Sequence, residues 1–244
     1  MSPAGAPSPR PFLRPLLGWA LGAPMLAFSV TLVFLLAPFC GGARAFWIIA
    51  PRYIRFTAWT FGIRRRLEGW EDLPEAIRDG RQPVILLGNH ASLFDPPLLI
   101  STLPCHAVFM AKRELAMVPF LGWVIWLADF IFIDRENRAK ALASLHAAAQ
   151  RILGGQSIIA FPEGTRSLDG ALLPFKKGAF TLALDAQVPV LPFAIRGWTA
   201  ILPKGSWRVA AGDYVIRLGQ PLPAGGAEEL RQRLEAAIRA LLDG

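Results

Sequence analysis

From Arg81 onward, short apolar runs alternate with segments of helical periodicity. The runs are rich in Val, Ile, Leu and Phe, and they are unbroken, which is typical of strands buried on both faces of a sheet. The predicted strands are Pro83–Gly88, His106–Met110, Asp129–Ile133, Ser157–Phe161 and Val188–Ile195. Trp207–Leu218 reads as a later strand or hairpin.

Helical patterns fill the intervals. Arg138–Leu153 places Leu142, Leu145, Ala149 and Ile152 on one stripe, and two glycines end it. Phe180–Ala186 is a shorter helix candidate, and Glu228–Leu242 closes the chain with apolar residues at helical spacing. This order predicts an α/β fold, with a single catalytic domain built on a central, mixed and largely parallel sheet flanked by helices.

The amino-terminal third is apolar. No charged residue lies between Arg14 and Arg44, and Leu16–Phe39 exceeds the ~20 residues that cross a hydrocarbon core as a helix. A secretory signal peptide would have a shorter apolar region, of ~7–15 residues. A single span should carry its arginines mainly on the cytoplasmic side, whereas here they flank both ends.

Aromatic residues and arginines mix in Phe46–Phe61, a composition that suits the lipid headgroup layer. A membrane-associated helical hairpin that enters and leaves one leaflet explains the charge on both flanks. We assign residues 1–14 to a flexible N-terminus, 15–66 to this two-helix segment and 67–244 to the catalytic domain. The cluster Arg64–Arg66 is either a contact with anionic headgroups or a solvated turn before that domain.

Composition favours a lipid partner over nucleic acid. Hydrophobic residues make up 53% of the 244 residues, mean hydropathy is +0.39, and the formal net charge is +8. A basic surface alone would suit either nucleic acid or anionic lipid. Cys40 and Cys105 form no CxxC pair, and the chain has three histidines, so we expect no metal site and no cofactor.

Polar groups gather where the strand Pro83–Gly88 ends. His90 and Asp95 lie in a turn before a helix, and loops beyond strand ends are where α/β proteins place reactive groups. Asp95 precedes two prolines and reads as a helix N-cap. Within the turn it can accept a hydrogen bond from one ring nitrogen of His90, leaving the other as a base. Alternatively, the pair only ties the turn together.

A second polar turn, Phe161–Ser167, follows another strand. Its glycine, hydroxyls and arginine suit a phosphate, with Arg166 as a bidentate ligand and Glu163 holding the loop. Further cations follow other strands or precede a helix: Lys112, Arg135, Lys176 and Lys177. Any one of them could be an ordinary surface charge, but together they favour an anion site beside His90.

Four blocks occur in order: Asn-His-x-Ser-x-x-Asp at 89–95, Phe-Ile-Asp-Arg at 132–135, Phe-Pro-Glu-Gly-Thr-Arg-Ser at 161–167 and Val-Pro-Val-Leu-Pro-Phe at 188–193. Together they resemble the motif blocks of the glycerolipid acyltransferases, especially the 1-acylglycerol-3-phosphate O-acyltransferases. The resemblance covers roughly Leu67 to Leu222. Ala91 departs from it, because an arginine is common at this position in the family.

The resemblance implies a one-step transfer without a covalent enzyme intermediate. His90 would deprotonate the acceptor hydroxyl, Asp95 would orient the imidazole, and Arg166 with Lys112 would hold the acceptor phosphate. The substrate-binding set is then Lys112, Arg135, Glu163, Gly164, Thr165, Arg166 and Lys177. A fatty acyl group would pass from acyl-CoA or acyl carrier protein to 1-acylglycerol-3-phosphate, forming phosphatidic acid for phospholipid biosynthesis.

The implied partners are a phospholipid membrane, a lysophospholipid acceptor and the thioester donor, with no nucleic acid. Because the donor is cytosolic and the composition is typical of a GC-rich bacterium, we expect the bacterial inner membrane, with the catalytic domain facing the cytoplasm. Another acceptor, such as a lyso-ornithine lipid, is an alternative. A non-catalytic lipid-binding module should show a damaged His-x4-Asp pair, and a serine hydrolase should show G-x-S-x-G, which is absent.

Overall fold

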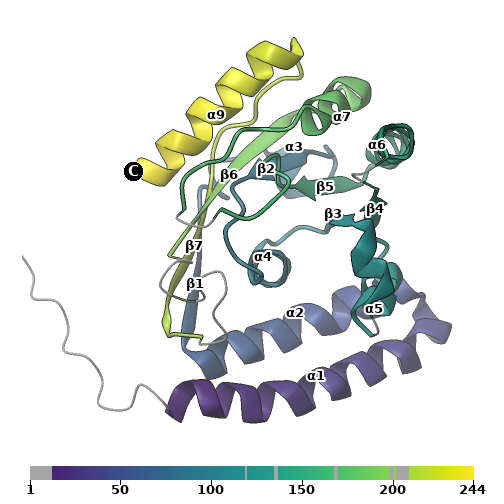
Figure 1. Cartoon of the computed structure of the whole chain (residues 1–244), viewed down its shortest axis with the longest axis vertical. Coiled ribbons are helices and arrows are strands. Elements are labelled where there is room, and N and C mark those ends of the chain that lie inside the picture. The colour runs from purple at the N-terminus through teal and green to yellow at the C-terminus, as the bar shows by residue number, and fades with distance from the viewer. Residues whose placement is uncertain (1–12, 119, 135–136, 168–169, 198–200, 202–208) are drawn as a thin grey trace, which may run out of the picture.

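The computed structural model describes residues 13–118, 120–134, 137–167, 170–197, 201 and 209–244 (Figure 1). Its described strands form one seven-stranded sheet in the order β1-β7-β6-β2-β5-β3-β4. Only the pairing of β6 with β7 is antiparallel. The strands are β1 (Ile63–Glu68), β2 (Ile85–Gly88), β3 (Ala107–Lys112), β4 (Ile131–Ile133), β5 (Ser157–Ala160), β6 (Val190–Arg196) and β7 (Gly212–Leu218). The predicted fold class, mixed and largely parallel, is confirmed.

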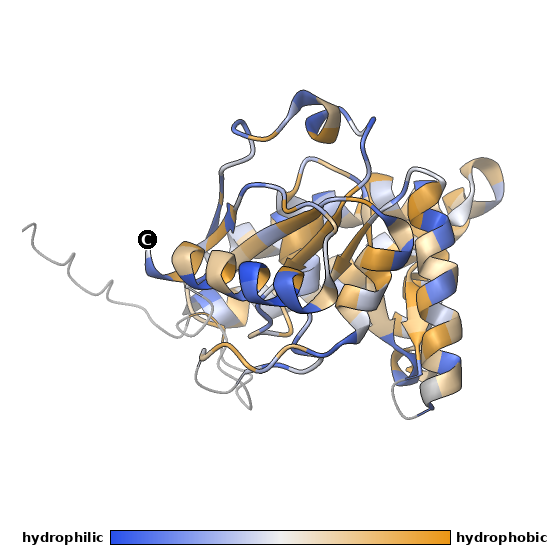
Figure 2. Ribbon diagram, turned by 90° about the horizontal axis from the view of Figure 1, so that it is seen from above, coloured by the Kyte–Doolittle hydropathy of each residue, from blue (hydrophilic) through white to orange (hydrophobic). Residues whose placement is uncertain are grey.

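Helices cover both faces of the sheet (Figure 1). One apolar cluster joins the sheet to α6 (Arg138–Leu153), α7 (Gly178–Ala186) and α9 (Ala227–Asp243). The other joins it to α2 (Gly42–Phe61), α3 (Glu75–Arg78) and α4 (Asp95–Thr102). In Figure 2 the central strands are mostly hydrophobic, whereas α9 alternates hydrophilic and hydrophobic residues, as expected for a helix with one buried face.

The two amino-terminal helices form a hairpin. The helix α1 (Leu13–Cys40) turns back into α2 at Gly41, whose φ of 85° favours glycine. The Tyr53 hydroxyl donates to the Gly22 carbonyl at 3.3 Å, and the Trp19 and Phe61 rings meet edge to face. By length and composition α1 could cross a membrane, and only 17% of its most apolar window is buried. Most of its apolar surface therefore has no protein partner among the described residues.

The arginine cluster lies in the sheet, so the turn interpretation is wrong, and its contact with anionic headgroups stays a prediction. Arg64–Arg66 belong to β1, where Arg64 pairs with Asp213 of β7 through Nε at 2.7 Å. Arg65 points the other way and donates to the Ser101 carbonyl at 2.8 Å. The sheet thus begins at Ile63, before the predicted boundary at residues 66 and 67. The pattern hid this strand because consecutive arginines mask the alternation of its two faces.

Other element ends also differ from the predictions. The strand expected at Asp129–Ile133 begins only at Ile131, since Asp129 has a left-handed φ of 62° and the chain is still turning there. In the predicted late strand or hairpin, β7 occupies residues 212–218, and residues 202–208 lie outside the described part. Between β3 and β4 the chain forms η1 (Arg113–Met117) and α5 (Leu121–Leu127), which the periodicity did not predict.

Candidate active site

The loop after β2 is fixed to the neighbouring strand β6. Gly88 lies so close to Phe193 that a Cβ there would meet its ring and carbonyl oxygen at 2.4 Å. The buried Asn89 side chain then makes two hydrogen bonds to one residue. Its Nδ2 donates to the Ile195 carbonyl at 3.1 Å, and its Oδ1 accepts from the Ile195 N–H at 2.7 Å. His90 is thereby held at the carboxyl ends of the central strands.

Asp95 is fully buried and lies against His90. Its Oδ2 is 2.8 Å from His90 Nδ1 and also accepts from the N–H groups of Ala91 and Ser92, both at 2.7 Å. A carboxylate only accepts, so Nδ1 of the neutral ring carries the proton and Nε2 keeps a lone pair. The side chain of His90 is 18% exposed and can reach a substrate. The arrangement suits a general base.

Asp95 is not a helix N-cap. The helix α4 begins at Asp95 itself, and Phe94 occupies the cap position without a side-chain hydrogen bond. The carboxylate turns backwards, toward the N–H groups of the preceding turn and the imidazole. Pro96 and Pro97 have no N–H, and the Leu98 N–H already donates to the Phe94 carbonyl at 2.9 Å, which leaves the oxygens of Asp95 available for this use.

Tyr214 is a member of the site that the sequence did not reveal. This fully buried tyrosine of β7 donates its hydroxyl to Asp95 Oδ1 at 3.0 Å. Burial and the nearby Asp95 carboxylate both raise the pKa of Tyr214, so the hydroxyl keeps its proton and acts as a donor. In the sequence, Tyr214 lies at an apolar position of an alternating strand and looks like a core residue.

The second polar turn is tied to the first by Glu163. Its Oε1 accepts from the N–H of His90 at 2.7 Å, and its Oε2 accepts from the N–H of Leu173 at 2.9 Å. The N–H of Ser167 donates to the His90 carbonyl at 2.9 Å. Burial raises the pKa of Glu163, and the two N–H donors oppose this shift. Glu163 is 2% exposed, so its geometry fits holding the loop and not touching a substrate.

We expect Glu163→Gln to lower the free energy of unfolding by about 1–3 kcal/mol, because the amide would turn an N–H toward one of the two backbone donors. Urea unfolding of the detergent-solubilised protein measures this change. Glu71→Gln is the control, since Glu71 is exposed and, among the described residues, pairs with Arg78 at 2.8 Å. Equal stability of the two variants would show that the Glu163 carboxylate does not hold the loops together.

The predicted cations differ in position. Lys112 ends β3, is half exposed and lies 3.2 Å from Glu114 Oε1. Arg135 lies outside the described residues. Gly164 and the half-buried Arg166 stand in the turn beside His90, with Thr165 exposed between them. Gly164 has a φ of 68°, and a Cβ on it would meet the Lys176 side chain at 2.8 Å.

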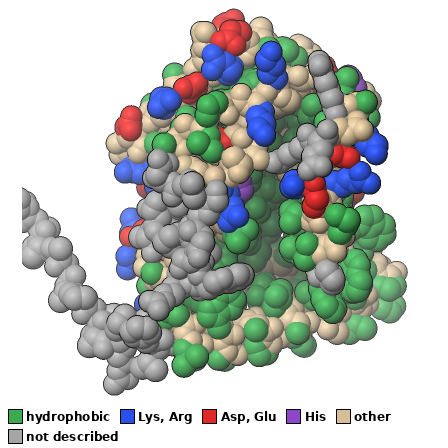
Figure 3. Space-filling model, viewed as in Figure 1, with side chains coloured by type: hydrophobic (Ala, Val, Ile, Leu, Met, Phe, Trp, Pro, Cys, Tyr) green, Lys and Arg blue, Asp and Glu red, His purple; other side chains and the backbone are tan. Residues whose placement is uncertain are grey.

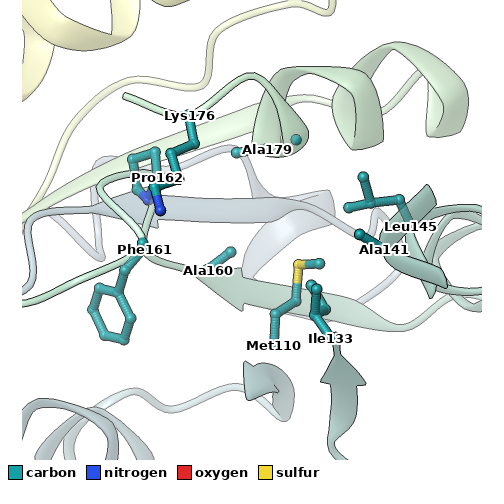
Figure 4. Close-up of a pocket in the computed structure, with 11 residues that line it drawn as sticks. Met110, Ile133, Ala141, Leu145, Ala160, Phe161, Pro162, Lys176 and Ala179 are labelled. Atoms are coloured by element: carbon teal, nitrogen blue, oxygen red, sulfur yellow. The ribbon is translucent and has the colours of Figure 1, made fainter. Parts of the chain in front are cut away.

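Lys176, not Lys177, stands over the turn. Lys176 lines a cavity of about 220 Å³ together with Gly164 and Phe161 (Figure 4). Lys177 is the cap residue just before α7 and influences Glu228 of α9, whose pKa is lowered mainly by Arg231 and to a smaller extent by Lys177. Adjacent residues at a helix start point in different directions, and the substrate contact expected of Lys177 stays a prediction.

The cavity beside the turn is mainly apolar. Met110, Ile133 and Leu145 line it from β3, β4 and α6 (Figure 4). Phe161 joins it to the pair of His90 and Asp95, because its ring stacks on His90 with 4.0 Å between the centroids. A base, a cation and an apolar cavity therefore meet at one edge of the sheet.

Possible metal ligands and the Cys105 thiol can be located in the described part of the chain. No group of three or more His, Cys, Asp or Glu side chains there could hold a metal ion. Burial raises the pKa of the Cys105 thiol to about 11, which leaves it protonated and unreactive at neutral pH.

Comparison with known proteins places this site in a family. The Acyltransferase family matches residues 64–196. The sheep and human proteins named 1-acyl-sn-glycerol-3-phosphate acyltransferase alpha are each 36% identical over 167 residues, which is 68% of this chain and 56% and 57% of theirs. The chain thus matches little more than half the length of these curated relatives.

A solved structure is similar over nearly the whole chain. The crystal structure of the 1-acyl-sn-glycerophosphate acyltransferase PlsC from Thermotoga maritima superposes with a TM-score of 0.78 at 28% identity and covers 95% of each chain. The family match spans all four motif blocks, and it confirms the resemblance drawn from them. The chain belongs to the acyltransferase family.

Proposed function

We propose that this protein transfers a fatty acyl group from a thioester to the free hydroxyl of 1-acylglycerol-3-phosphate, forming phosphatidic acid. The observation that carries the proposal is the buried Asp95 that fixes the proton on Nδ1 of His90 and leaves Nε2 open beside cations and an apolar cavity. The relatives' names support the same acceptor. The thioester donor is acyl-CoA or acyl carrier protein.

In this reaction His90 both takes up and returns the transferred proton. Nε2 takes the proton of the acceptor hydroxyl while the hydroxyl oxygen attacks the thioester carbonyl, which forms the ester C–O bond. The C–S bond then breaks, and the imidazolium returns the proton to the leaving thiolate. Asp95 stabilises the transient imidazolium and keeps the ring in place. General-base help of this kind typically contributes ~10²–10⁴ in rate, and positioning of the two substrates must supply much of the rest.

Lys176, Arg166 and Lys112 are the described cations that we assign to the acceptor phosphate, with Arg135 as a further candidate from the motif. An arginine can bind a phosphate through two parallel hydrogen bonds, and a lysine acts as a point charge. The backbone of Gly164, with its left-handed φ, lets the turn approach the phosphate closely. The apolar cavity would take part of an acyl chain.

We expect Lys176→Gln to raise KM for the lysolipid about 10–100-fold, because it removes a charge-assisted contact to the phosphate. Lys177→Gln is the matched control and should change KM less than about twofold, since Lys177 does not line the cavity. Steady-state kinetics with lysophosphatidic acid in mixed micelles separates KM from kcat. Equal effects of the two substitutions, or a rise in KM for the donor alone, would remove Lys176 from the acceptor site.

Membrane attachment follows from the same reaction, because the acceptor is a lipid. We propose that the α1–α2 hairpin inserts into the inner membrane of a bacterium, with the catalytic domain on the cytoplasmic side where thioester donors are made. The exposed apolar surface of α1 supports this. Figure 3 shows hydrophobic side chains over the hairpin, and most of the charged side chains in that view lie farther from it.

A further inference from the structure

A second apolar surface lies outside the hairpin, on the segment between β3 and β4. We call residues 115–118 and 120–127, from the end of η1 through α5, the α5 wedge. Its large apolar side chains point into solvent: Met117 is 74% exposed, Trp126 72% and Phe120 64%. No charged residue lies between Glu114 and Asp129. So many exposed apolar groups on one short segment indicate a binding surface.

The wedge is held in this exposed conformation. Gly122 packs against the preceding turn so closely that a Cβ there would meet the Ala116 carbonyl oxygen at 2.2 Å. Phe120 adopts a left-handed φ of 63°, which is costly for a bulky residue and leaves its ring exposed. The opposite face of α5 packs against the protein, since Ile125 is buried. The exposed side is therefore a fixed feature of the fold.

Charged pairs border the wedge at both ends. Arg113 pairs with Asp134 at 2.7 Å, and Lys112 lies 3.2 Å from Glu114. At the far end, Asp129 pairs with Arg151 at 2.6 Å. An apolar segment with ion pairs at both ends is the distribution expected of an element that enters the hydrocarbon layer while its ends stay among the headgroups.

The wedge continues the apolar surface of the hairpin. The Trp123 ring meets the Phe34 ring of α1 edge to face at 6.5 Å, and Leu127 packs so closely on Gly42 of α2 that a Cβ there would lie 2.7 Å from it. On α1 the nearby Leu35 is 62% exposed. Figure 3 shows hydrophobic side chains over the hairpin and over the neighbouring region where Figure 1 places α5.

We propose that the α5 wedge inserts into the same lipid bilayer as the hairpin and forms a second point of membrane attachment. The proposal rests on the membrane attachment given under the proposed function. A bilayer fits better than a second protein copy, because the apolar surface is continuous with a helix long enough to span a membrane. Lys112, at the base of the wedge, would then lie at headgroup depth, where an acceptor phosphate is found.

Site-directed spin labelling of the full chain in phosphatidylcholine–phosphatidylglycerol vesicles tests the wedge. After Cys40→Ala and Cys105→Ala, a nitroxide is attached through Met117→Cys or Trp126→Cys in the wedge. Leu35→Cys reports on the hairpin, and Leu153→Cys, an exposed leucine at the end of α6, is the aqueous control. Retained acyl transfer shows that each variant is folded. Accessibility to oxygen and to a water-soluble nickel chelate gives the depth of each label.

We expect both wedge labels to resemble Leu35→Cys, with oxygen accessibility high and nickel accessibility at least about tenfold below that of Leu153→Cys. Aqueous wedge labels beside a lipid-exposed Leu35→Cys would overturn the wedge and leave the hairpin attached. If all labels are aqueous, the proposed membrane attachment also falls. Dipolar broadening between Trp126→Cys labels would identify a second copy as the partner and reject the bilayer.

Discussion

Replacing His90 by alanine is expected to lower kcat by ~10²–10⁴, the usual contribution of a positioned general base. KM for the lysolipid should change little, because the cations and the cavity that bind it stay in place. Acyl transfer in reconstituted vesicles, with a radiolabelled or mass-resolved product, measures the loss. Added imidazole should restore part of the activity, since the substitution leaves space beside Phe161 and Asp95 where a free base can bind.

His106→Ala is the control for this prediction. His106 is exposed and directly precedes β3, at the amino ends of the parallel strands, whereas His90 lies at their carboxyl ends. Its ring stacks on Trp47 of α2 with 5.0 Å between the centroids. It should keep kcat within about twofold of the parent, because nothing in its surroundings suits a base for the reaction. Equal activity of His90→Ala and the parent protein would rule out His90 as the base.

Asp95→Asn should reduce kcat by a similar ~10²–10⁴ and preserve the fold. An asparagine oxygen can still accept from the N–H groups of Ala91 and Ser92, and the Tyr214 hydroxyl can rotate to accept from its amide. The negative charge beside the imidazole is lost, however, so the imidazolium that forms during transfer is no longer stabilised. The kcat values of the two proteins across pH, together with an unfolding curve of each, test this.

Tyr214→Phe tests the hydrogen bond that Tyr214 donates to Asp95 without changing the charge of Asp95. It removes one hydrogen bond to Oδ1 and leaves the carboxylate and its contact with His90 intact. We expect a loss of about 0.5–1.5 kcal/mol in the free energy of unfolding and a fall in kcat of less than about tenfold. If Asp95→Asn behaves like Tyr214→Phe, the carboxylate only ties the turn together, which is the alternative that the sequence left open.

The central strands could be predicted because they are buried on both faces and therefore read as unbroken apolar runs. The meeting of His90 with the turn at Glu163 followed from the same pattern, since parallel strands bring their carboxyl ends to one edge. β1 could not be predicted in this way. It lies at the edge of the sheet, and Arg64 and Arg65 contact Asp213 and the Ser101 carbonyl, partners far away in the chain.

The direction in which side chains point also could not be predicted from the sequence. The sequence shows two adjacent lysines before α7, and only the structure shows that Lys176 reaches the turn. Tyr214 was hidden because a buried tyrosine looks like any core residue until its hydroxyl is seen to meet Asp95. The α5 wedge was missed for a related reason, because an apolar segment normally predicts burial, whereas this one is held in solvent.

The most direct test of the central claim is product formation by the parent protein in vesicles, with a panel of lysolipids as acceptors and with acyl-CoA and acyl carrier protein as donors. The account predicts that lysophosphatidic acid is converted to phosphatidic acid with at least one of these donors and faster than any other acceptor. Transfer only to a lyso-ornithine lipid would keep the His90 chemistry and contradict the assigned substrate. No acyl transfer to any lysolipid would contradict the proposed function.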